Sequence, residues 1–543
     1  MKQKLISKRR RRKRTLWIAS IAVLVVVLIV ALCGYYVRDN VAIGDHIPAN
    51  CSAMLTVRDL QSRWMTLKGL PQWNYAVTNY SDEFPWLASA DKMGDVKEWF
   101  LMNLIGQEVR LVACADQGSG NSPTLVVYTK ISRVGKFADL IARLARRVRM
   151  ESDQGVGIRH IDAGGAFYYT VLGRVLVGGQ SREQVSAAAT LSPTARLVEP
   201  AAFVRMRSGG EAPWATLYWN FETGAVTSKT APFKALYAAM TVEQEGIKAR
   251  FEVPFTTEFG ARVQQLTGKM QPRTSRTTMR MPADIVAGMT VCGSAPIAEI
   301  LQNVSEAFGA PQLRPDTWSS SLASRGGTVP GVCGSLFAEV VRQFANEGTI
   351  ALTNVDTYEI VPTPEFLLFG EVAPGVEKKF LDKLVRATEL ASSGKQQLQR
   401  KTLKGVEMVY LDLPEGKSLQ VCVAEIGGML AATTSEYALD SFIDAVLGNK
   451  PSLKTTEPNL IKPEQGANLI LVVNVQRLAE VSREMFDLLL EYDLIIDMNR
   501  EEYDRGIAPW IGLVELVRSV GLSGFFGSDG LAGELVAPFS RTS

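Results

Sequence analysis

Histidine is the side chain that most often serves as a general base or a metal ligand near neutral pH. This chain contains only two, His46 and His160, and they lie far apart in the sequence. No histidine cluster for zinc, and no Ser–His or Cys–His triad, can be placed with them. The six cysteines are widely spaced and include no C-x-x-C pair, so they predict neither zinc ligation nor a disulfide scaffold. We therefore expect no catalytic residue and no metal site.

Two short motifs have the residue types and spacing of known functional motifs, but the secondary structure predicted around them differs. The tetrapeptide SSGK at 392–395 has the S-x-x-K spacing of penicillin-recognising enzymes, in which the serine begins a helix. Here a glycine intervenes and the motif follows a predicted helix. Residues 118–123 are rich in glycine, but they join two predicted strands, whereas a phosphate-binding loop opens a helix. Neither motif predicts an enzyme, and no cofactor is expected.

The sharpest polar feature is an acidic stretch at 478–503, which we expect to form one long helix. Asp493, Asp497 and Glu501 are spaced at i, i+4 and i+8, so they would share one face of that helix. One helix face cannot supply the roughly six to eight oxygens that Ca²⁺ takes. Three interpretations stay open: a solvated surface, a surface that docks a protein partner, and a metal site that needs further ligands from elsewhere. The three carboxylates are the candidate partner-binding residues.

Positive charge is concentrated at the start of the chain. Nine of the first 14 residues are Lys or Arg, although the net charge of all 543 residues is only +3. Residues 16–37 follow without any charge, and a helix of this length covers a bilayer core of roughly 30 Å. Because basic residues stay on the cytoplasmic side, we expect a cytoplasmic tail (1–14) and a transmembrane helix (15–37).

This interpretation places the protein in the bacterial cytoplasmic (inner) membrane, with residues 16–37 in contact with the lipid bilayer and the bulk of the chain in the periplasm. The alternatives are a cleaved signal peptide, with small residues at Ala31 and Cys33, and a lipidated Cys33. The basic run lies beside the apolar segment, so it predicts membrane orientation and no nucleic-acid binding.

The rest of the chain contains one unit twice. LGRVLVGGQSREQV at 172–185 aligns without gaps with IGGMLAATTSEYAL at 426–439. EGIKARFEVPF at 245–255 aligns in the same way with DGLAGELVAPF at 529–539. Blocks that recur in the same order indicate an internal duplication. We expect repeat units at 45–270 and 278–543, joined by the polar stretch near 271–278, with an acidic helical insertion at about 476–512 in the second unit.

The spacing of apolar residues along the chain predicts the helices and strands of each unit. Residues 125–131 and 350–354 read as short buried strands, and 134–147 and 376–390 have apolar residues at helical spacing. Strands in runs, separated by single helices, are typical of the α+β class. The predicted fold is therefore α+β: an N-terminal transmembrane helix, then two homologous units of antiparallel or mixed sheet with helices packed on one face.

The strands that open with Pro48 and Pro282, and the glycine hairpins at 172–185 and 426–439, resemble an uncharacterised bacterial family. Its members are envelope proteins of unknown function with one N-terminal span and a large repeated ectodomain. The resemblance covers most of 45–540 and implies a cell-envelope setting. It brings no catalytic or binding residue to this chain.

The expected function is that of a non-enzymatic single-pass envelope protein whose duplicated ectodomain binds another envelope protein or assembly. One alternative is a periplasmic carrier of a lipid or other apolar ligand, which an apolar cleft would favour. The other is a hydrolase with an unrecognised site, which convergent polar groups with shifted pKa values would favour.

Overall fold

The computed structural model describes residues 41–540 apart from 83–107, 115–123, 134, 137–138, 140–148, 154–155, 163–165, 209–211, 223–231, 319, 321–327, 358–361, 373–376, 392–397, 413–419, 461–465, 493 and 496–497. The chain divides into two compact units. The first draws on Met1–Thr66, Met93–Ala201 and Leu217–Thr227, and the second on Leu67–Lys92, Ala202–Thr216 and Ser228–Ser543.

The first compact unit is an antiparallel sheet built on a meander. Its strands lie in the order β4 (Arg149–Asp153), β5 (Val156–Asp162), β6 (Ala166–Leu172), β7 (Val175–Gly179), β3 (Thr124–Lys130), β2 (Glu108–Cys114) and β1 (Cys51–Arg58). The β6–β7 turn holds Gly173 at φ 58°, a left-handed conformation that glycine adopts freely. Helix α7 (Arg182–Ala189) follows, with Ser181 as its N-cap.

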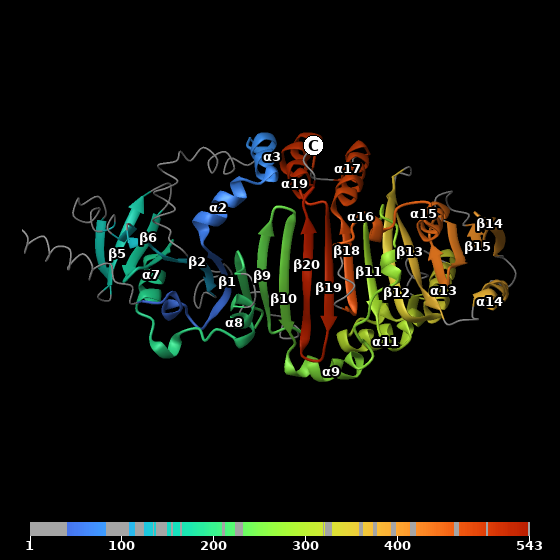
Figure 1. Cartoon of the computed structure of the whole chain (residues 1–543), viewed down its shortest axis with the longest axis horizontal. Helices are drawn as coiled ribbons and strands as arrows, with labels where there is room; N and C mark the ends of the chain where they lie inside the picture. The colour runs from blue at the N-terminus through green and yellow to red at the C-terminus, as the bar shows by residue number, and fades with distance from the viewer. Residues whose placement is uncertain are drawn as a thin grey trace, which may run out of the picture. The chain divides into compact units, whose positions relative to one another are not determined.

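The second compact unit contains one continuous antiparallel sheet of twelve described strands (Figure 1). Their order is β9 (Ala235–Glu243), β10 (Gly246–Pro254), β20 (Gly530–Pro538), β19 (Ser519–Phe526), β18 (Leu469–Asn474), β11 (Ala287–Cys292), β12 (Phe344–Asp356), β13 (Thr363–Val372), β17 (Met429–Thr433), β16 (Gln420–Ile426), β15 (Val406–Asp412) and β14 (Gln399–Leu403). No pairing among these strands is parallel.

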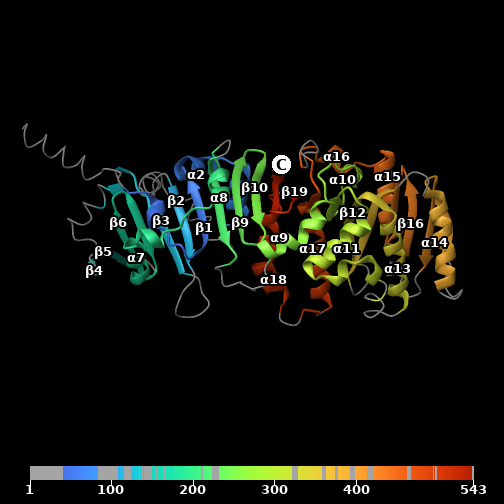
Figure 2. The same cartoon turned by 90° about the horizontal axis from the view of Figure 1, so that it is seen from below.

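Helices cover both faces of this sheet (Figure 2). One hydrophobic core includes side chains of α9 (Thr257–Thr267), α11 (Ile297–Phe308), α13 (Thr328–Arg342) and α14 (Glu377–Ala391). The other core includes side chains of α15 (Glu436–Leu447), which begins at the N-cap Ser435. Strand β17 is buried at every position, and its successive side chains alternate between the two cores.

The predicted fold class, α+β with helices packed on one face of each unit's sheet, is therefore wrong. The antiparallel pairing was one of the two predicted arrangements, but the strands of the second compact unit form one large sheet and its helices do not share one face. The physical reason is visible in MLAAT at 429–433, which is apolar at consecutive positions. A strand with one solvated face alternates apolar and polar residues, whereas a strand buried on both faces is apolar without interruption.

The predicted membrane anchor also requires correction. No helix among the described residues is both long enough and apolar enough to cross a membrane. The tail (1–14) and the apolar segment (15–37) lie outside those residues. The structure thus does not support a single-pass anchor in the inner membrane, and that localisation is corrected, while contact with the lipid bilayer stays a prediction. Hydropathy shows that a segment avoids charge, but it does not by itself establish a membrane-spanning helix.

Strands β10 and β20 pair with local twofold symmetry, and we call this strand pair the seam. They contain the two aligned blocks of sequence, 245–255 and 529–539, and they pair with each other. Arg250 faces Glu534, its own equivalent in the alignment. Gly246 faces Pro538, and their equivalents Gly530 and Pro254 also face each other, so the pairing has a local twofold axis at Arg250–Glu534. The predicted repeat limits, 45–270 and 278–543, stay a prediction.

Further described elements are η1 (Ile43–His46), α2 (Leu60–Lys68), α3 (Pro71–Tyr80), η2 (Pro193–Ala195), α8 (Ala201–Ser208), β8 (Ala215–Asn220), α10 (Thr277–Arg280), η3 (Pro311–Leu313), η4 (Pro315–Thr317), α16 (Leu453–Thr456), α17 (Val475–Glu491), α18 (Arg500–Gly506) and α19 (Ala508–Val514).

Candidate functional site

The acidic stretch is not the single helix that its spacing predicts. Helix α17 ends at Glu491, and α18 begins at Arg500 after the N-cap Asn499. The Asn499 side chain accepts from the Glu502 amide (3.0 Å), and the Glu502 carboxylate accepts from the Asn499 amide (2.9 Å). This reciprocal pair is a capping box, which satisfies amides that a continuous helix would have bonded internally. It therefore favours a new helix start at this point.

Only one of the three predicted partner-binding residues lies in the part of the chain that the structure describes. Asp493 and Asp497 lie outside the described residues. Glu501 is exposed on α18 and forms an ion pair with Arg505, with 2.5 Å between Oε1 and Nη2. The shared helix face that motivated the prediction is thus not formed, and partner docking through these three carboxylates stays a prediction.

The two histidines lie on different elements, His46 on η1 and His160 on β5. Burial lowers the pKa of His46, and its Nδ1 lies 3.3 Å from the Ala188 carbonyl oxygen. The His160 ring stacks on Tyr168, with 4.8 Å between ring centroids. The motifs at 118–123 and 392–395 lie outside the described residues. Within the part of the chain that the structure describes, no three His, Cys, Asp or Glu side chains are grouped to hold a metal ion.

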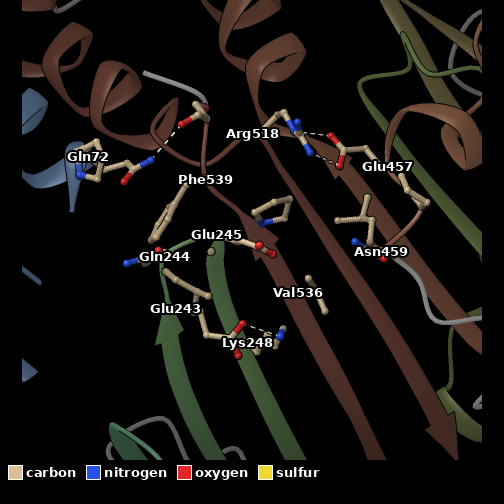
Figure 3. Close-up of a pocket in the computed structure, with 17 residues that line it drawn as sticks. Gln72, Glu243, Gln244, Glu245, Lys248, Glu457, Asn459, Arg518, Val536 and Phe539 are labelled. Atoms are coloured by element: carbon tan, nitrogen blue, oxygen red, sulfur yellow. Dashed lines mark hydrogen bonds and ion pairs between the residues drawn. The ribbon is translucent and has the colours of Figure 1, made fainter. Parts of the chain in front are cut away.

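A groove of about 860 Å³ lies at one end of the β10–β20 seam, within the second compact unit (Figure 3). Its walls come from five segments: the β9–β10 turn, the end of β20, the chain before β18, the residue before β19, and the start of α3. The lining residues are Pro71, Gln72, Glu243, Gln244, Glu245, Gly246, Ile247, Lys248, Glu457, Pro458, Asn459, Leu460, Arg518, Val536, Pro538, Phe539 and Ser540. We call this hollow the seam groove.

Close backbone contacts hold the walls of the seam groove. A Cβ atom at Gly246 would lie 2.5 Å from the Ala537 carbonyl oxygen, so only glycine lets the β9–β10 turn approach β20 this closely. The Phe539 amide donates to the Glu245 carbonyl oxygen at 2.9 Å. On the α3 side, Gln72 Nε2 donates to the Ser540 carbonyl oxygen at 3.1 Å. The shape of the groove is thus set by backbone hydrogen bonds as well as by side chains.

Both cations of the seam groove are already paired with carboxylates. Arg518 binds Glu457 in a bidentate fashion, with Nε–Oε1 and Nη2–Oε2 distances of 2.5 Å (Figure 3). Lys248 Nζ lies 2.7 Å from Glu243 Oε2, and this hydrogen bond raises the pKa of Lys248. Among the described residues, no hydrogen bond or ion pair reaches the Glu245 carboxylate, which lies between these two pairs in Figure 3. The free negative charge therefore belongs to Glu245.

The lining also includes apolar residues. Phe539, Val536 and Leu460 contribute side chains, together with three prolines. An aromatic ring beside aliphatic groups and a few fixed polar groups is the composition of a ligand-binding cleft. The arrangement suits contact with an apolar surface flanked by positive charge, and it presents no nucleophile activated by a neighbouring base.

The opposite end of the seam is closed. Phe255 is the equivalent of Phe539, and it is only 4% exposed, whereas Phe539 is half-buried. Its ring packs against Phe259 of α9 and Phe526 of β19, with centroid distances of 4.9 and 5.1 Å. Two equivalent residues on equivalent strands thus have different surroundings, and only the Phe539 end contains a groove.

The seam groove cannot be recognised from the sequence alone. Its residues are ordinary types from five separate segments, and no motif unites them. One signal was available: the aligned blocks at 245–255 and 529–539 contain Glu245, Gly246 and Phe539. That alignment identifies equivalent positions, but it does not say that the two blocks pair with each other.

Comparison with known proteins assigns no family. No protein-family model matches the chain, and no curated protein matches it either. Among solved structures, it is similar to crystal form III of TP0453, with a TM-score of 0.25 and 10% identity over 43% of this chain and 90% of that one. Crystal form IV of TP0453 gives a TM-score of 0.26 and 11% identity over 43% and 87%. Similarity this low carries no argument, and the resemblance to an uncharacterised envelope family stays a prediction.

Proposed function

We propose that this protein is a non-enzymatic binding protein and that the seam groove receives its protein partner. The observation that carries the proposal is the contrast between Phe539 and Phe255. A half-buried aromatic ring lines the groove at one end, while its equivalent is enclosed by other aromatic rings at the other end. Aromatic side chains beside a cleft are typical anchors of protein interfaces.

The polar groups of the groove support binding in preference to chemistry. Arg518 and Lys248 are each neutralised by a carboxylate at 2.5–2.7 Å, so they are held as parts of the wall. Catalysis of acyl or phosphoryl transfer needs positive groups or amides directed at developing charge. The groove instead offers apolar contact and the unpaired Glu245 carboxylate.

The proposal is tested by photocrosslinking in cells that produce the full chain. A benzophenone amino acid replaces Gln244, an exposed residue of the groove lining, and in a control protein it replaces Ser528, its equivalent at the closed end. We expect a discrete protein adduct from position 244 and none from position 528. The same adducts from both positions, or no protein adduct from 244, would show that the groove is not the binding site.

A second candidate function is the carriage of an apolar ligand, favoured by a different surface of the same unit. Leu471, Met289 and Ile350 are 37%, 40% and 42% exposed and face one another across β18, β11 and β12. Adjacent exposed apolar side chains on a sheet indicate a binding surface. A fluorescent fatty acid should bind the protein and lose affinity in Met289→Glu. Unchanged affinity in that variant removes this candidate.

A further inference from the structure

Two cysteines of the first compact unit lie opposite each other on neighbouring strands. Strands β1 and β2 pair antiparallel, and Cys51, the first residue of β1, is the Cα partner of Cys114, the last residue of β2. Directly opposite residues of an antiparallel pair have Cα atoms roughly 4.5–5.5 Å apart. The Cα atoms of a disulfide are usually about 4.4–6.8 Å apart. This register therefore has the spacing of a cross-strand disulfide.

An irregularity in β1 brings Cys51 to this position. Ala53 lies opposite Ala113, and with regular pairing Ser52 would come next, opposite Cys114. The register instead shifts by one residue, as in a β-bulge, and Cys51 takes that place. The Ser52 hydroxyl donates to the Ala113 carbonyl oxygen at 2.9 Å, which holds the extra residue against β2. The bulge thus aligns two cysteines that regular pairing would leave one residue out of step.

The two thiols share buried surroundings. Cys51 is 0% exposed and Cys114 is 9% exposed. Burial raises the pKa of Cys51, and the neighbouring Cys114 raises it further. Burial likewise raises the pKa of Tyr128, and both cysteines add to that shift. Groups that influence one another in this way lie close together, so the side chains as well as the backbones of the two cysteines are neighbours.

The cysteines of the second compact unit have different neighbours. Cys292 lies opposite Glu347, and Cys422 lies opposite Tyr410 and Thr433. The fifth described cysteine belongs to helix α13. In the part of the chain that the structure describes, one pair of cysteines is therefore placed opposite each other on paired strands.

We propose that Cys51 and Cys114 form a disulfide bond that fastens β1 to β2. Both carry thiols in this structure, so the bond requires an oxidant. The oxidant is the disulfide of an exchange partner, either a disulfide-donating protein or oxidised glutathione. One cysteine thiolate attacks the donor disulfide and releases one donor thiol, and the second cysteine attacks the mixed disulfide and releases the other. Two protein thiols thus become one disulfide while the donor disulfide becomes two thiols.

The burial of both thiols indicates that the bond forms while the chain folds. Burial raises the pKa of Cys51 to about 12 and that of Cys114 to about 11. The thiolate is the species that attacks a disulfide, so neither cysteine reacts readily once it is enclosed. Enclosure also keeps reductants away from the finished bond. The geometry therefore favours a permanent structural bond over a reversible switch.

The path of the chain between the two cysteines gives the bond its effect. Residues Leu67–Lys92 lie between them in the sequence and belong to the second compact unit, whereas β1 and β2 belong to the first. Pairing of β1 with β2 therefore closes a long loop. A cross-link at this point limits the freedom of the unfolded chain, and this effect grows with the length of the loop. The bond lies in the first compact unit, so it does not depend on the function of the seam groove.

Peptide mapping tests whether the bond forms. The full chain is synthesised in a cell-free system with oxidised glutathione and a disulfide isomerase, and in parallel with a reductant. Thiols are then alkylated in denaturant, and the chain is digested with trypsin. Trypsin releases peptides 39–58 and 111–130, each with one of the two cysteines. Mass spectrometry should find them joined in the oxidised sample and separate in the reduced one. Alkylated Cys51 and Cys114 in both samples, or a bond from either to another cysteine, would overturn the proposal.

Thermal unfolding tests whether the bond stabilises the fold. The melting temperature of the unaltered chain should be at least about 5 °C higher in the oxidised than in the reduced sample. Cys51→Ala and Cys114→Ala should each abolish this difference, and the control Cys292→Ala should keep it. Any packing lost with the sulfur atom is the same in both samples, so the difference isolates the bond. A difference that persists in either variant, or none in the unaltered chain, would contradict a stabilising disulfide between these two residues.

Discussion

At the scale of single residues, the same residue type has different consequences at the two ends of the seam. Phe255 is enclosed by Phe233, Phe259 and Phe526, whereas Phe539 faces the seam groove. Burial of an aromatic ring contributes to stability in proportion to the apolar area removed from water. The contribution of each phenylalanine therefore depends on what covers it, which the alignment of the two blocks does not reveal.

Truncation of these two rings should give unequal losses. Phe255→Ala is expected to lower the free energy of unfolding by about 3–5 kcal/mol, because it leaves a cavity in an aromatic cluster. Phe539→Ala should cost less than about 1.5 kcal/mol, since its ring is only partly buried. Urea denaturation followed by tryptophan fluorescence measures both. Equal losses would contradict the different environments of the two rings.

The burial of Glu365 on β13 makes the stability of the fold depend on pH. Burial raises the pKa of its carboxyl group, and a hydrogen bond from Ser435 opposes that shift. An acid with a raised folded pKa binds its proton more tightly in the folded than in the unfolded state. It therefore destabilises the fold above the folded pKa, and this penalty disappears as the pH falls through the folded pKa towards the ordinary value of about 4.3.

Glu365→Gln should accordingly raise the melting temperature at pH 7, because the amide keeps the shape of the side chain without the buried charge. The gain should shrink as the pH falls from 7 to 4. Thermal unfolding of the two proteins across this range measures the difference. A variant that is less stable at pH 7, or a gain that grows at low pH, would contradict the assigned direction of the pKa.

At the scale of elements, close backbone approach determines where the seam can turn. Gly246 and Gly530 are equivalent, and each begins a strand of the seam. A Cβ atom at Gly246 would lie 2.5 Å from the Ala537 carbonyl oxygen, and one at Gly530 would lie 2.4 Å from the Val253 carbonyl oxygen. These oxygens are also equivalent, so the same steric requirement occurs once at each end.

Alanine at either glycine should force the two strands apart. We expect Gly246→Ala and Gly530→Ala each to cost about 1–3 kcal/mol, which is the usual cost of overpacking. Gly506→Ala in α18 is the control, because nothing lies within 4 Å of its Cβ position, and it should be neutral or stabilising by up to about 1 kcal/mol. Denaturant unfolding compares the three. A tolerated alanine at either seam glycine would refute the close approach at that end.

At the scale of the whole molecule, part of the polar stretch near 271–278 is buried within the second compact unit. Thr277 and Thr278 are 0% exposed. The buried Glu347 carboxylate accepts from the Thr277 amide at 2.8 Å and from the Arg276 amide at 3.0 Å. Thr277 and Thr290 hydroxyls each lie 2.7 Å from that of Thr349, which extends the network into β11 and β12. The side chains of Ser275, Thr277 and Thr278 are thus buried in a polar sequence because they are hydrogen-bonded there.

The segment 275–278 should therefore resist proteolysis although its composition resembles that of a linker. Limited digestion with a protease of broad specificity, read by mass spectrometry, should find no early cleavage between Ser275 and Thr278. Glu347→Ala leaves the buried hydroxyls and amides without their acceptor, so cleavage there should appear in that variant. Early cleavage in the unaltered protein would show that the segment is an exposed linker.

What the sequence by itself determined is local. The aligned glycines Gly173 and Gly427 occupy hairpin turns with φ near 58° and 59°, and Ser181 and Ser435 cap the helices that follow. These features depend on residues within one or two turns of each other, so their signals are contained in short segments. The capping box at Asn499 is of the same kind, and the helical spacing of the acidic residues concealed it.

What only the tertiary structure decided is non-local. Alternation in β10 places Ile247, Ala249 and Phe251 on one face and Lys248, Arg250 and Glu252 on the other, but it does not name a neighbouring strand. The pairing with β20, the burial of β17 on both faces and the opening beside Phe539 follow from which distant segments together remove the most apolar surface from water. Which segments pack together depends on the free energy of the whole folded chain, so it cannot be predicted from a local pattern of residues.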